Sequence, residues 1–214
     1  MAVETEIKFS VTDSTILDSV ASLDRIAGYD ARDRGVRSHT DTYFDTVDRQ
    51  LLHGKVVFRL RTREDISLLT FKASAGVSSE SPEDGIHRRI EIECLAEATA
   101  EDIRMQRYPD LPPVTALRER MGRIELNVSL TARNNRRTIL LMKEDAPRFE
   151  LVLDDVVFEG PGGTKGICEI EVEKMTGTDD ELQEIGAWLA ERCDVAPAGP
   201  SKYILGMTLV GFTE

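Results

Sequence analysis

The feature that most constrains this chain is a set of segments in which charged residues alternate with apolar ones. The first, residues 3–11, places Glu4, Glu6 and Lys8 at alternate positions, with Ile7 and Phe9 among the residues between and after them. Successive side chains of a β-strand point to opposite faces, so the alternation predicts a strand with one charged and one apolar face. An antiparallel strand with one solvated face shows the same pattern. The later segments decide between a solvated face and a charged cavity.

These later segments carry charges of mainly one sign. Basic residues occupy alternate positions at Arg59, Arg61 and Arg63, and acidic residues do so within residues 169–173. Like charges two residues apart repel one another, more so where solvent is scarce. Such rows become favourable when each faces an external charge of opposite sign. Carboxylates suit Mg²⁺ or Mn²⁺ and arginines suit a polyanion, so together they describe a phosphoryl-transfer site.

Two sets of candidate site residues follow from the charged faces. The acidic set is Glu4, Glu6, Glu91, Glu93, Glu169, Glu171 and Glu173. The basic set is Lys8, Arg59, Arg61, Arg63, Lys72, Arg89, Arg133 and Arg137. A solvated sheet face usually mixes signs with small polar residues, so the repetition of single-sign rows favours a cavity. For Arg63 and Glu173, a solvated strand end is an equally good interpretation.

Composition narrows the function classes. The net charge of −12 argues against general binding to nucleic acid or anionic membranes. The three cysteines match no zinc or disulfide spacing, and three histidines argue against a His-built zinc site. No apolar run approaches the about 20 residues of a membrane helix, and no signal-peptide pattern is present. We therefore expect a cytoplasmic protein with reduced thiols, and the length of 214 residues allows one or two domains.

Strand-like segments outnumber helix-like ones and occur in two blocks. They are residues 3–11, 39–46, 56–63, 67–72, 88–93, 125–133, 136–143, 149–158 and 167–173. Helices are predicted over 13–27, from 99, over 113–121 and from 178. Asn134-Asn135 is interpreted as a break between two strands, residues 160–166 as a glycine-rich hairpin turn, and residues 73–87 as a mobile connection. This pattern predicts a mainly β (α+β) fold with one closed antiparallel sheet and helices outside it.

The order of short motifs resembles that of the CYTH superfamily, the triphosphate tunnel metalloenzymes. The resemblance covers nearly the whole chain and implies a single CYTH-like domain over residues 1–214. The motifs are Glu4-x-Glu6-x-Lys8, Tyr43-Phe-Asp-Thr46 with Leu51-Leu52, Arg59-Leu-Arg61, Thr70-Phe-Lys72, Arg89-Ile-Glu-Ile-Glu93, Leu153-Asp154-Asp155, Glu169-Ile-Glu171 and Ser201-Lys202-Tyr203.

The resemblance implies an eight-stranded antiparallel closed β-tunnel with a polar interior that binds a triphosphate. Expected metal ligands are Glu4, Glu6, Glu91, Glu93, Asp154, Glu169 and Glu171. Expected substrate-binding residues are Lys8, Arg59, Arg61, Lys72, Arg89, Arg133, Arg137 and Lys202, with Glu171, Lys8 and Arg59 in catalytic roles. Arg136 or Arg137 is an alternative to Arg133, and Asp154 is expected to face inward rather than Asp155.

The sequence thus predicts a Mg²⁺- or Mn²⁺-dependent triphosphatase, with inorganic tripolyphosphate as the favoured substrate. Three alternatives stay open: a class IV-like adenylate cyclase, a thiamine triphosphatase, and a non-enzymatic polyphosphate- or nucleotide-binding module. A structural β protein with wet faces is a more distant alternative. The expected partner is a small molecule that contains a triphosphate, with no nucleic acid and no membrane. The oligomeric state is open, and a homodimer is compatible with the sequence.

Overall fold

The computed structural model describes residues 2–64, 66–74, 85–107 and 110–212. The strands are β1 (Ala2–Val11), β2 (Arg25–Ile26), β3 (Tyr29–Asp45), β4 (Val57–Arg63), β5 (Ile66–Ser74), β6 (His87–Leu95), β7 (Asn127–Lys143), β8 (Ala146–Gly160), β9 (Gly163–Lys174) and β10 (Val195–Pro197). The helices are α1 (Ser14–Ala21), α2 (Gln50–His53), α3 (Ala100–Arg104), α4 (Pro112–Met121), α5 (Asp179–Arg192) and α6 (Lys202–Val210). No helix in the described ranges has the length and apolar character needed to cross a membrane.

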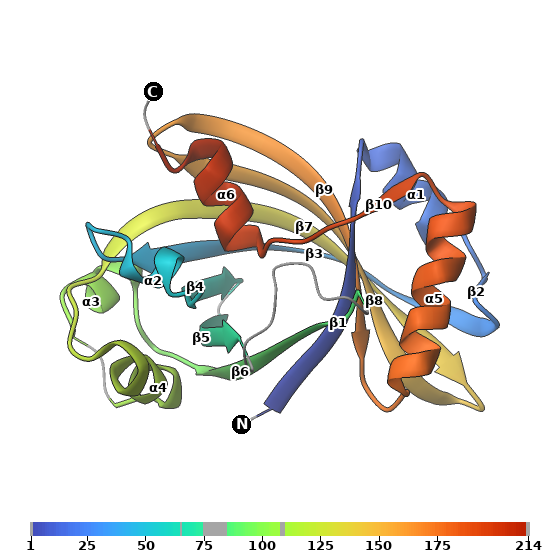
Figure 1. The fold of residues 1–214 in the computed structure, drawn as a ribbon, viewed down its shortest axis with the longest axis horizontal. Helices are drawn as coiled ribbons and strands as arrows, with labels where there is room; N and C mark the ends of the chain where they lie inside the picture. Colours follow the sequence, from blue (N-terminus) through green and yellow to red (C-terminus); the bar gives the residue numbers. More distant parts are fainter. Residues whose placement is uncertain (1, 65, 75–84, 108–109, 213–214) are drawn as a thin grey trace.

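Eight of these strands form a closed antiparallel ring. Their order is β1-β6-β5-β4-β3-β7-β8-β9, and pairing between β1 and β9 closes it. The two short strands lie at the margins, because β10 pairs with β1 and β2 pairs with β3. Figure 1 shows the long strands β3, β7, β8 and β9 curving over the shorter β4 and β5. The predicted fold class, a mainly β protein with a closed antiparallel sheet and helices outside, is confirmed.

The strand register sorts charged side chains to the inside of the ring. Lys8 on β1 lies opposite Glu171 on β9, whereas the neighbouring Ile7 and Phe9 lie opposite Val172 and Ile170. The same parity continues around the ring, so most of the charged site residues face the interior and most of the outer face there is apolar. This distribution inverts that of a small barrel with an apolar core. It requires the outer face to be covered.

Helices cover the apolar outer face in two places. Around α1 and α5, one core cluster gathers outward side chains of β1, β7, β8 and β9, among them Phe9, Leu151 and Ile170. Around α3 and α4, a second cluster gathers outward side chains of β4 and β5, including Phe58 and Leu69. Both α3 and α5 begin with a capping box, as the spacing of Thr and acidic residues predicts. Burial on the outer face thus supplies the hydrophobic stabilisation that the charged interior cannot.

The last helix, α6, packs against inward-facing residues of the ring instead. Its Tyr203 and Met207 belong to a third apolar cluster with Leu130 and Phe158, which lie on the inner faces of β7 and β8. The approach is close, because a Cβ at Gly206 would lie 2.8 Å from the Phe158 ring. Helix α6 therefore seals one part of the interior with apolar contacts and brings its first residue, Lys202, to the charged part.

Three local predictions differ from the structure. The helix predicted over residues 13–27 ends at Ala21, because the chain turns through Ala27 and Gly28, both at positive φ, into the β2–β3 hairpin. Strand β3 begins at residue 29, ten residues before the predicted start. The break predicted at Asn134-Asn135 is wrong: β7 runs without interruption there, with both residues paired to β3 and β8.

The glycine-rich segment does form the β8–β9 hairpin connection, and the backbone N–H of Gly162 donates to the carbonyl of Val210 at the end of α6. In the connection predicted over 73–87, residues 75–84 lie outside the described residues.

Candidate active site

A cavity inside the ring is lined mainly by charged side chains. We call it the central cavity. Its charged lining residues are Glu4, Glu6, Lys8, Arg59, Lys72, Arg89, Arg136, Glu171, Glu173 and Lys202. A wider adjoining cavity shares Glu4, Arg59, Lys72, Arg136 and Glu173 with it and adds Arg61, Glu91 and Glu93. Residues from every part of the sequence thus converge on one charged interior, which is the arrangement a polyanion and a cation could share.

Three buried carboxylates meet where β8 and β9 lie side by side. One oxygen each of Asp154, Glu169 and Glu171 lies within 4.8 Å of the others. The ammonium of Lys202 sits among them, 2.9 Å from Asp154 and 2.8 Å from Glu171, and also contacts Glu169. Converging carboxylate oxygens are the donor set that Mg²⁺ and Mn²⁺ prefer. The cluster therefore fits a divalent cation, and the cation it surrounds in this structure is the Lys202 ammonium.

Lys8 and Arg89 connect this cluster to the acidic residues of β1. Lys8 contacts Glu171 and lies 3.3 Å from Glu6. Arg89, which reaches over from β6, lies 2.5 Å from Glu6. Although burial disfavours its charge, the neighbouring Glu171 and Glu6 raise the pKa of Lys8 above its ordinary value. Both basic side chains are therefore charged and held in place before any ligand enters.

On β5, Lys72 and Thr70 engage the remaining acidic residues. The ammonium of Lys72 lies 2.7 Å from Glu4 and 3.2 Å from Glu91. The hydroxyl of Thr70 donates to Glu93 at 2.7 Å. These contacts leave Glu91 and Glu93 at the wider end of the interior, away from the three-carboxylate cluster.

A buried aspartate on β3 holds two of the predicted phosphate-binding arginines together. Asp41 is 1% exposed and accepts a bidentate pair of hydrogen bonds from Arg61, at 2.7 and 2.8 Å. It also accepts one from Arg59 at 3.1 Å. Burial alone would raise the pKa of Asp41, but Arg59 and Arg61 hold it well below its usual range. The carboxylate stays ionised and fixes both guanidinium groups.

Two of the three cluster carboxylates, Asp154 and Glu171, stay ionised for the same reason, whereas burial raises the pKa of the third, Glu169. Burial would raise the pKa of Asp154, but Arg136 and Lys202 lower it strongly. Glu171 is likewise lowered by Lys202, Lys8 and Arg136 against the effect of burial. Glu173 behaves in the opposite way: burial, together with Glu4 and Glu6, raises its pKa to about 8. A cation bound near these acidic residues would favour its ionised form.

The structure separates the arginines of β7. Arg136 faces inward, with a bidentate contact to Asp154 at 2.8 and 2.6 Å and a third contact to Glu171 at 3.2 Å. Arg133 and Arg137 point outward, where they pair with Glu159 and with Asp33. The substrate-binding role expected for Arg133 and Arg137 is therefore not supported, because the continuous strand puts both on the outer face and the alternative, Arg136, on the inner one.

The other expected site residues all reach the charged interior. They are Glu4, Glu6, Lys8, Arg59, Arg61, Lys72, Arg89, Glu91, Glu93, Asp154, Glu169, Glu171 and Lys202. Asp154 is fully buried and faces inward, whereas Asp155 borders a different pocket, which Glu169 and Leu205 of α6 also line. Glu173, for which two interpretations were open, lines the central cavity.

Sequence reasoning missed Asp41 and His39. Both belong to the inward row of β3, because Asp41 lies opposite Arg61 in the ladder with β4 and His39 lies opposite Asn134 in the ladder with β7. The strand predicted from residue 39 already places His39, Asp41 and Tyr43 on one face. These three side chains include only one acid, so they do not show the single-sign pattern by which the other site residues were found. Burial, with Arg61 nearby, lowers the pKa of His39 to about 3.

Comparison with solved structures shows the same fold in proteins of low sequence identity. An adenylate cyclase-like protein from Bacillus halodurans is 18% identical, with a TM-score of 0.68 over 96% of this chain and 98% of its own. An adenylyl cyclase-like protein from Hippeastrum, described as having a dominant triphosphatase activity, is 17% identical. Its TM-score is 0.66, and the match covers 96% of this chain and 95% of the Hippeastrum chain. An adenylate cyclase-like protein from Vibrio parahaemolyticus is 18% identical. Its TM-score is 0.52, and the match covers 94% of this chain and 97% of the Vibrio chain. No curated protein sequence matches the chain significantly.

The fold and the site together define a class of protein: a closed antiparallel β-sheet with a charged site in its interior. The profile of the CYTH domain matches residues 2–194, and the chain belongs to this family. The resemblance to the CYTH superfamily that the sequence motifs indicate is confirmed.

Proposed function

We propose that the protein hydrolyses a triphosphate with the help of a divalent cation, and that inorganic tripolyphosphate is its preferred substrate. The observation that carries this proposal is the composition of the central cavity. Six basic side chains and four carboxylates line one cavity, and one of these carboxylates, Glu171, also belongs to the three-carboxylate cluster. A polyanion alone would call for basic residues only, so the carboxylates indicate that a cation accompanies it.

The basic residues bind and orient the phosphate chain in this proposal. In the structure these side chains pair with carboxylates, and phosphate oxygens can replace carboxylate oxygens as partners of Lys8, Arg59 and Arg136. Asp41 keeps Arg59 and Arg61 on the cavity wall, which makes the arrangement rigid before the substrate arrives. Preorganised donors of this kind stabilise charge that develops on the transferred phosphoryl group.

The three-carboxylate cluster is the proposed cation site. A divalent cation held by Asp154, Glu169 and Glu171 would neutralise charge on the phosphate oxygens and lower the pKa of a bound water. Because the pKa of Glu171 is held far below its usual value, this carboxylate suits a cation ligand better than a proton acceptor. Hydrolysis joins the water oxygen to the terminal phosphorus and breaks its bond to the bridging oxygen, giving orthophosphate and pyrophosphate.

The preference for an inorganic chain rests on the aromatic residues of the cavity. Tyr43 and Tyr203 are stacked on each other, with ring centroids 5.3 Å apart, and each is 1% exposed. Tyr203 also donates to Asp45 at 2.6 Å. Neither ring offers a free face on which a purine could stack, so a nucleotide base gains little in this part of the cavity.

An assay of product formation tests the proposal. Purified protein is incubated with Mg²⁺ and tripolyphosphate, ATP or thiamine triphosphate, and orthophosphate, pyrophosphate and cyclic AMP are measured. We expect Mg²⁺-dependent orthophosphate release, fastest from tripolyphosphate. Arg59→Ala should reduce the rate by about 10³-fold, since a positioned arginine on a transferring phosphoryl group contributes at least that much.

Arg137→Ala is the matched control for Arg59→Ala, because it removes an arginine on the outer face of the ring. Its rate should stay within about twofold of the unmodified protein. Cyclic AMP and pyrophosphate from ATP, with little orthophosphate from tripolyphosphate, would instead identify an adenylate cyclase. That outcome would agree with the description of the Bacillus and Vibrio proteins of this fold.

A further inference from the structure

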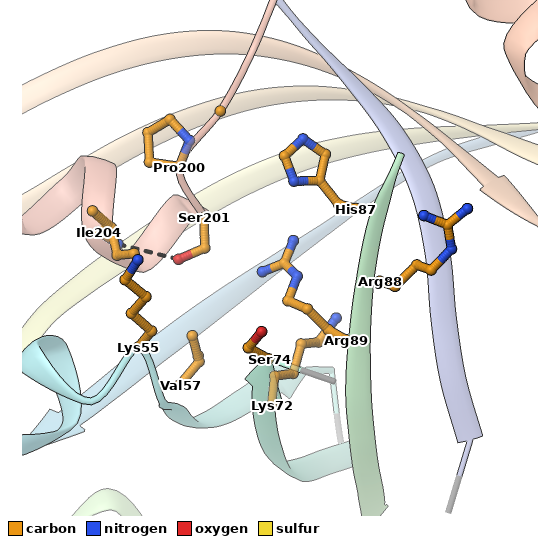
Figure 2. Close-up of a pocket in the computed structure, with 11 residues that line it drawn as sticks. Lys55, Val57, Lys72, Ser74, His87, Arg88, Arg89, Pro200, Ser201 and Ile204 are labelled. Atoms are coloured by element: carbon orange, nitrogen blue, oxygen red, sulfur yellow. Dashed lines mark hydrogen bonds between the residues drawn. The ribbon is translucent and has the colours of Figure 1, made fainter. Parts of the chain in front are cut away.

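The basic side chains of the interior already have partners within the protein. Lys72 contacts Glu4, and Arg89 contacts Glu6. Figure 2 shows Lys72 and Arg89 between the strands β5 and β6 on one side and the segment that leads into α6 on the other. A phosphate chain must compete with carboxylates for such groups. An inward polar side chain without a partner can bind a ligand without this competition.

Two neutral side chains on the inner face meet this condition. His39 on β3 and Asn134 on β7 lie directly opposite each other in the antiparallel ladder and are 7% and 3% exposed. Within the described part of the chain, neither Nδ2 nor Oδ1 of Asn134 has a hydrogen-bond partner, and Nε2 of His39 has none. A buried polar atom without a partner is destabilising, because it loses its hydrogen bonds to water and gains none in return. The ring thus retains an unfavourable polar pair in its interior.

The pair lies beside two arginines that line the wider cavity, which adjoins the central cavity. Asp41, two residues from His39 on the same strand face, binds Arg61, and Arg136 lies two residues from Asn134 on the same face of β7. Both arginines line the wider cavity. The Nε2 atom of His39 lies 3.8 Å from Oδ2 of Asp41, which is too far for a hydrogen bond. Two side chains with unpaired polar atoms therefore lie next to the guanidinium groups that face the cavity.

We propose that Asn134 and His39 are further substrate-binding residues, which donate hydrogen bonds to a phosphate oxygen that Arg136 binds. This inference rests on the proposed function, because it concerns the same phosphate chain. When Arg136 exchanges the Asp154 carboxylate for a phosphate oxygen, that oxygen lies beside the amide of Asn134, and Arg61 stays bound to Asp41. The pair thus completes the phosphate site on the side of β3 and β7.

The pair adds hydrogen-bond donors without adding charge. The amide of Asn134 is uncharged, and the low pKa of His39 keeps its imidazole neutral. Neither residue therefore needs a carboxylate to balance it when no substrate is bound. The amide nitrogen of Asn134 always carries donors, whereas Nε2 of His39 donates in only one of two tautomers. Asn134 is for this reason the residue on which the inference is tested.

Asn134→Leu separates a ligand contact from a structural role. Leucine is close to asparagine in shape, and Val156, the ladder neighbour of Asn134 on β8, is apolar. Without ligand, urea unfolding should give a free energy of unfolding at least as high as that of the unmodified protein, because two unpaired buried polar atoms are removed. Calorimetry with tripolyphosphate and chelator should show about tenfold weaker binding, since one hydrogen bond to a charged oxygen contributes on that order.

Asn135→Leu is the matched control, because Asn135 is the next residue of β7 and is exposed on the outer face, where it accepts from the hydroxyl of Ser38 at 2.7 Å. Its affinity for tripolyphosphate should stay within about twofold of that of the unmodified protein. If leucine at position 134 prevents folding or lowers stability, Asn134→Thr and Asn134→Val replace it. These two variants share one shape, and only threonine keeps a donor, so it should bind tripolyphosphate more tightly.

Three outcomes would overturn the inference. They are an Asn134→Leu affinity equal to that of the unmodified protein, equal affinities of the threonine and valine variants, and no binding of tripolyphosphate by the unmodified protein. The first of these together with normal Mg²⁺-dependent release of orthophosphate would leave the proposed function intact. A protein whose binding of tripolyphosphate depends on Asn134 but which releases no orthophosphate would retain the inference and refute the proposed hydrolysis.

Discussion

Replacement of Asp41 by asparagine tests whether the arginines of β4 are held in a preorganised site. The carboxylate is 1% exposed and accepts three hydrogen bonds from Arg59 and Arg61. Removal of one partner from a buried ion pair costs about 3–5 kcal/mol, because it leaves uncompensated charge in a poorly solvated place. We expect Asp41→Asn to lower the free energy of unfolding by about that amount at pH 7. Urea unfolding can be followed by the fluorescence of Trp188, the single tryptophan.

Asp45→Asn provides the matched control on the same strand. Asp45 is 2% exposed, but its carboxylate accepts from backbone N–H groups of residues 46, 51 and 52 and from Tyr203, not from a basic side chain. Its replacement should cost about 1–3 kcal/mol. Tripolyphosphate without metal should restore more stability to Asp41→Asn than to Asp45→Asn, since the phosphate oxygens replace the missing carboxylate. A loss below about 1 kcal/mol in Asp41→Asn, or equal recovery in the two variants, would refute this account of the arginine pair.

Three further predictions follow from the same interior. Mg²⁺ should raise the melting temperature of the protein, and Glu6→Gln should reduce that rise although circular dichroism shows an intact fold. A rise in the variant as large as in the unmodified protein would show that Glu6 is not a metal ligand. Arg136→Gln should lower triphosphatase activity by at least about 10²-fold and Arg137→Gln by less than about twofold, whereas similar losses would contradict the inward orientation of Arg136. Because the pKa of His39 is about 3 in the folded protein and about 6.5 in the unfolded chain, the unfolded chain binds more protons below pH 6.5, so stability is lost as the pH falls. His39→Gln should therefore reduce the slope of stability against pH between 6 and 4 by about 1 kcal/mol per pH unit in urea unfolding; equal slopes would show that His39 is not held neutral.

Alternation along single strands was enough to predict much of the candidate site. Glu4, Glu6 and Lys8 could be assigned to one face because every second residue of a strand points the same way. The same rule placed Arg59 and Arg61 together. The rule depends on knowing where a strand continues, and this condition failed on β7.

The dipeptide Asn134-Asn135 has turn propensity, but tertiary pairing to two neighbouring strands overrides it. Because the continuous strand alternates through this point, Arg136 faces inward and Arg133 and Arg137 do not. The sequence around residues 134–135 does not indicate that this segment pairs with β3 and β8. The inward face of β7 could therefore not be predicted from the sequence at this point.

Two other features depend on contacts between distant segments. Asp41 becomes a site residue because β4 places two arginines beside it, and no pattern within residues 39–46 indicates that neighbour. Helix α6 enters the inner face of the ring because Leu130 and Phe158 form an apolar surface there. Periodicity gives the faces of each element, but it does not say which face of the sheet a helix will cover.

Hydrolysis of tripolyphosphate in ¹⁸O-labelled water, followed by ³¹P nuclear magnetic resonance, tests the central claim most directly. If water attacks the terminal phosphorus of a chain held by the charged interior, Mg²⁺-dependent turnover should give equal amounts of orthophosphate and pyrophosphate, with the label in orthophosphate alone. Label in pyrophosphate would show attack at the central phosphorus. No Mg²⁺-dependent product from tripolyphosphate would contradict the assignment of this interior as a triphosphatase site.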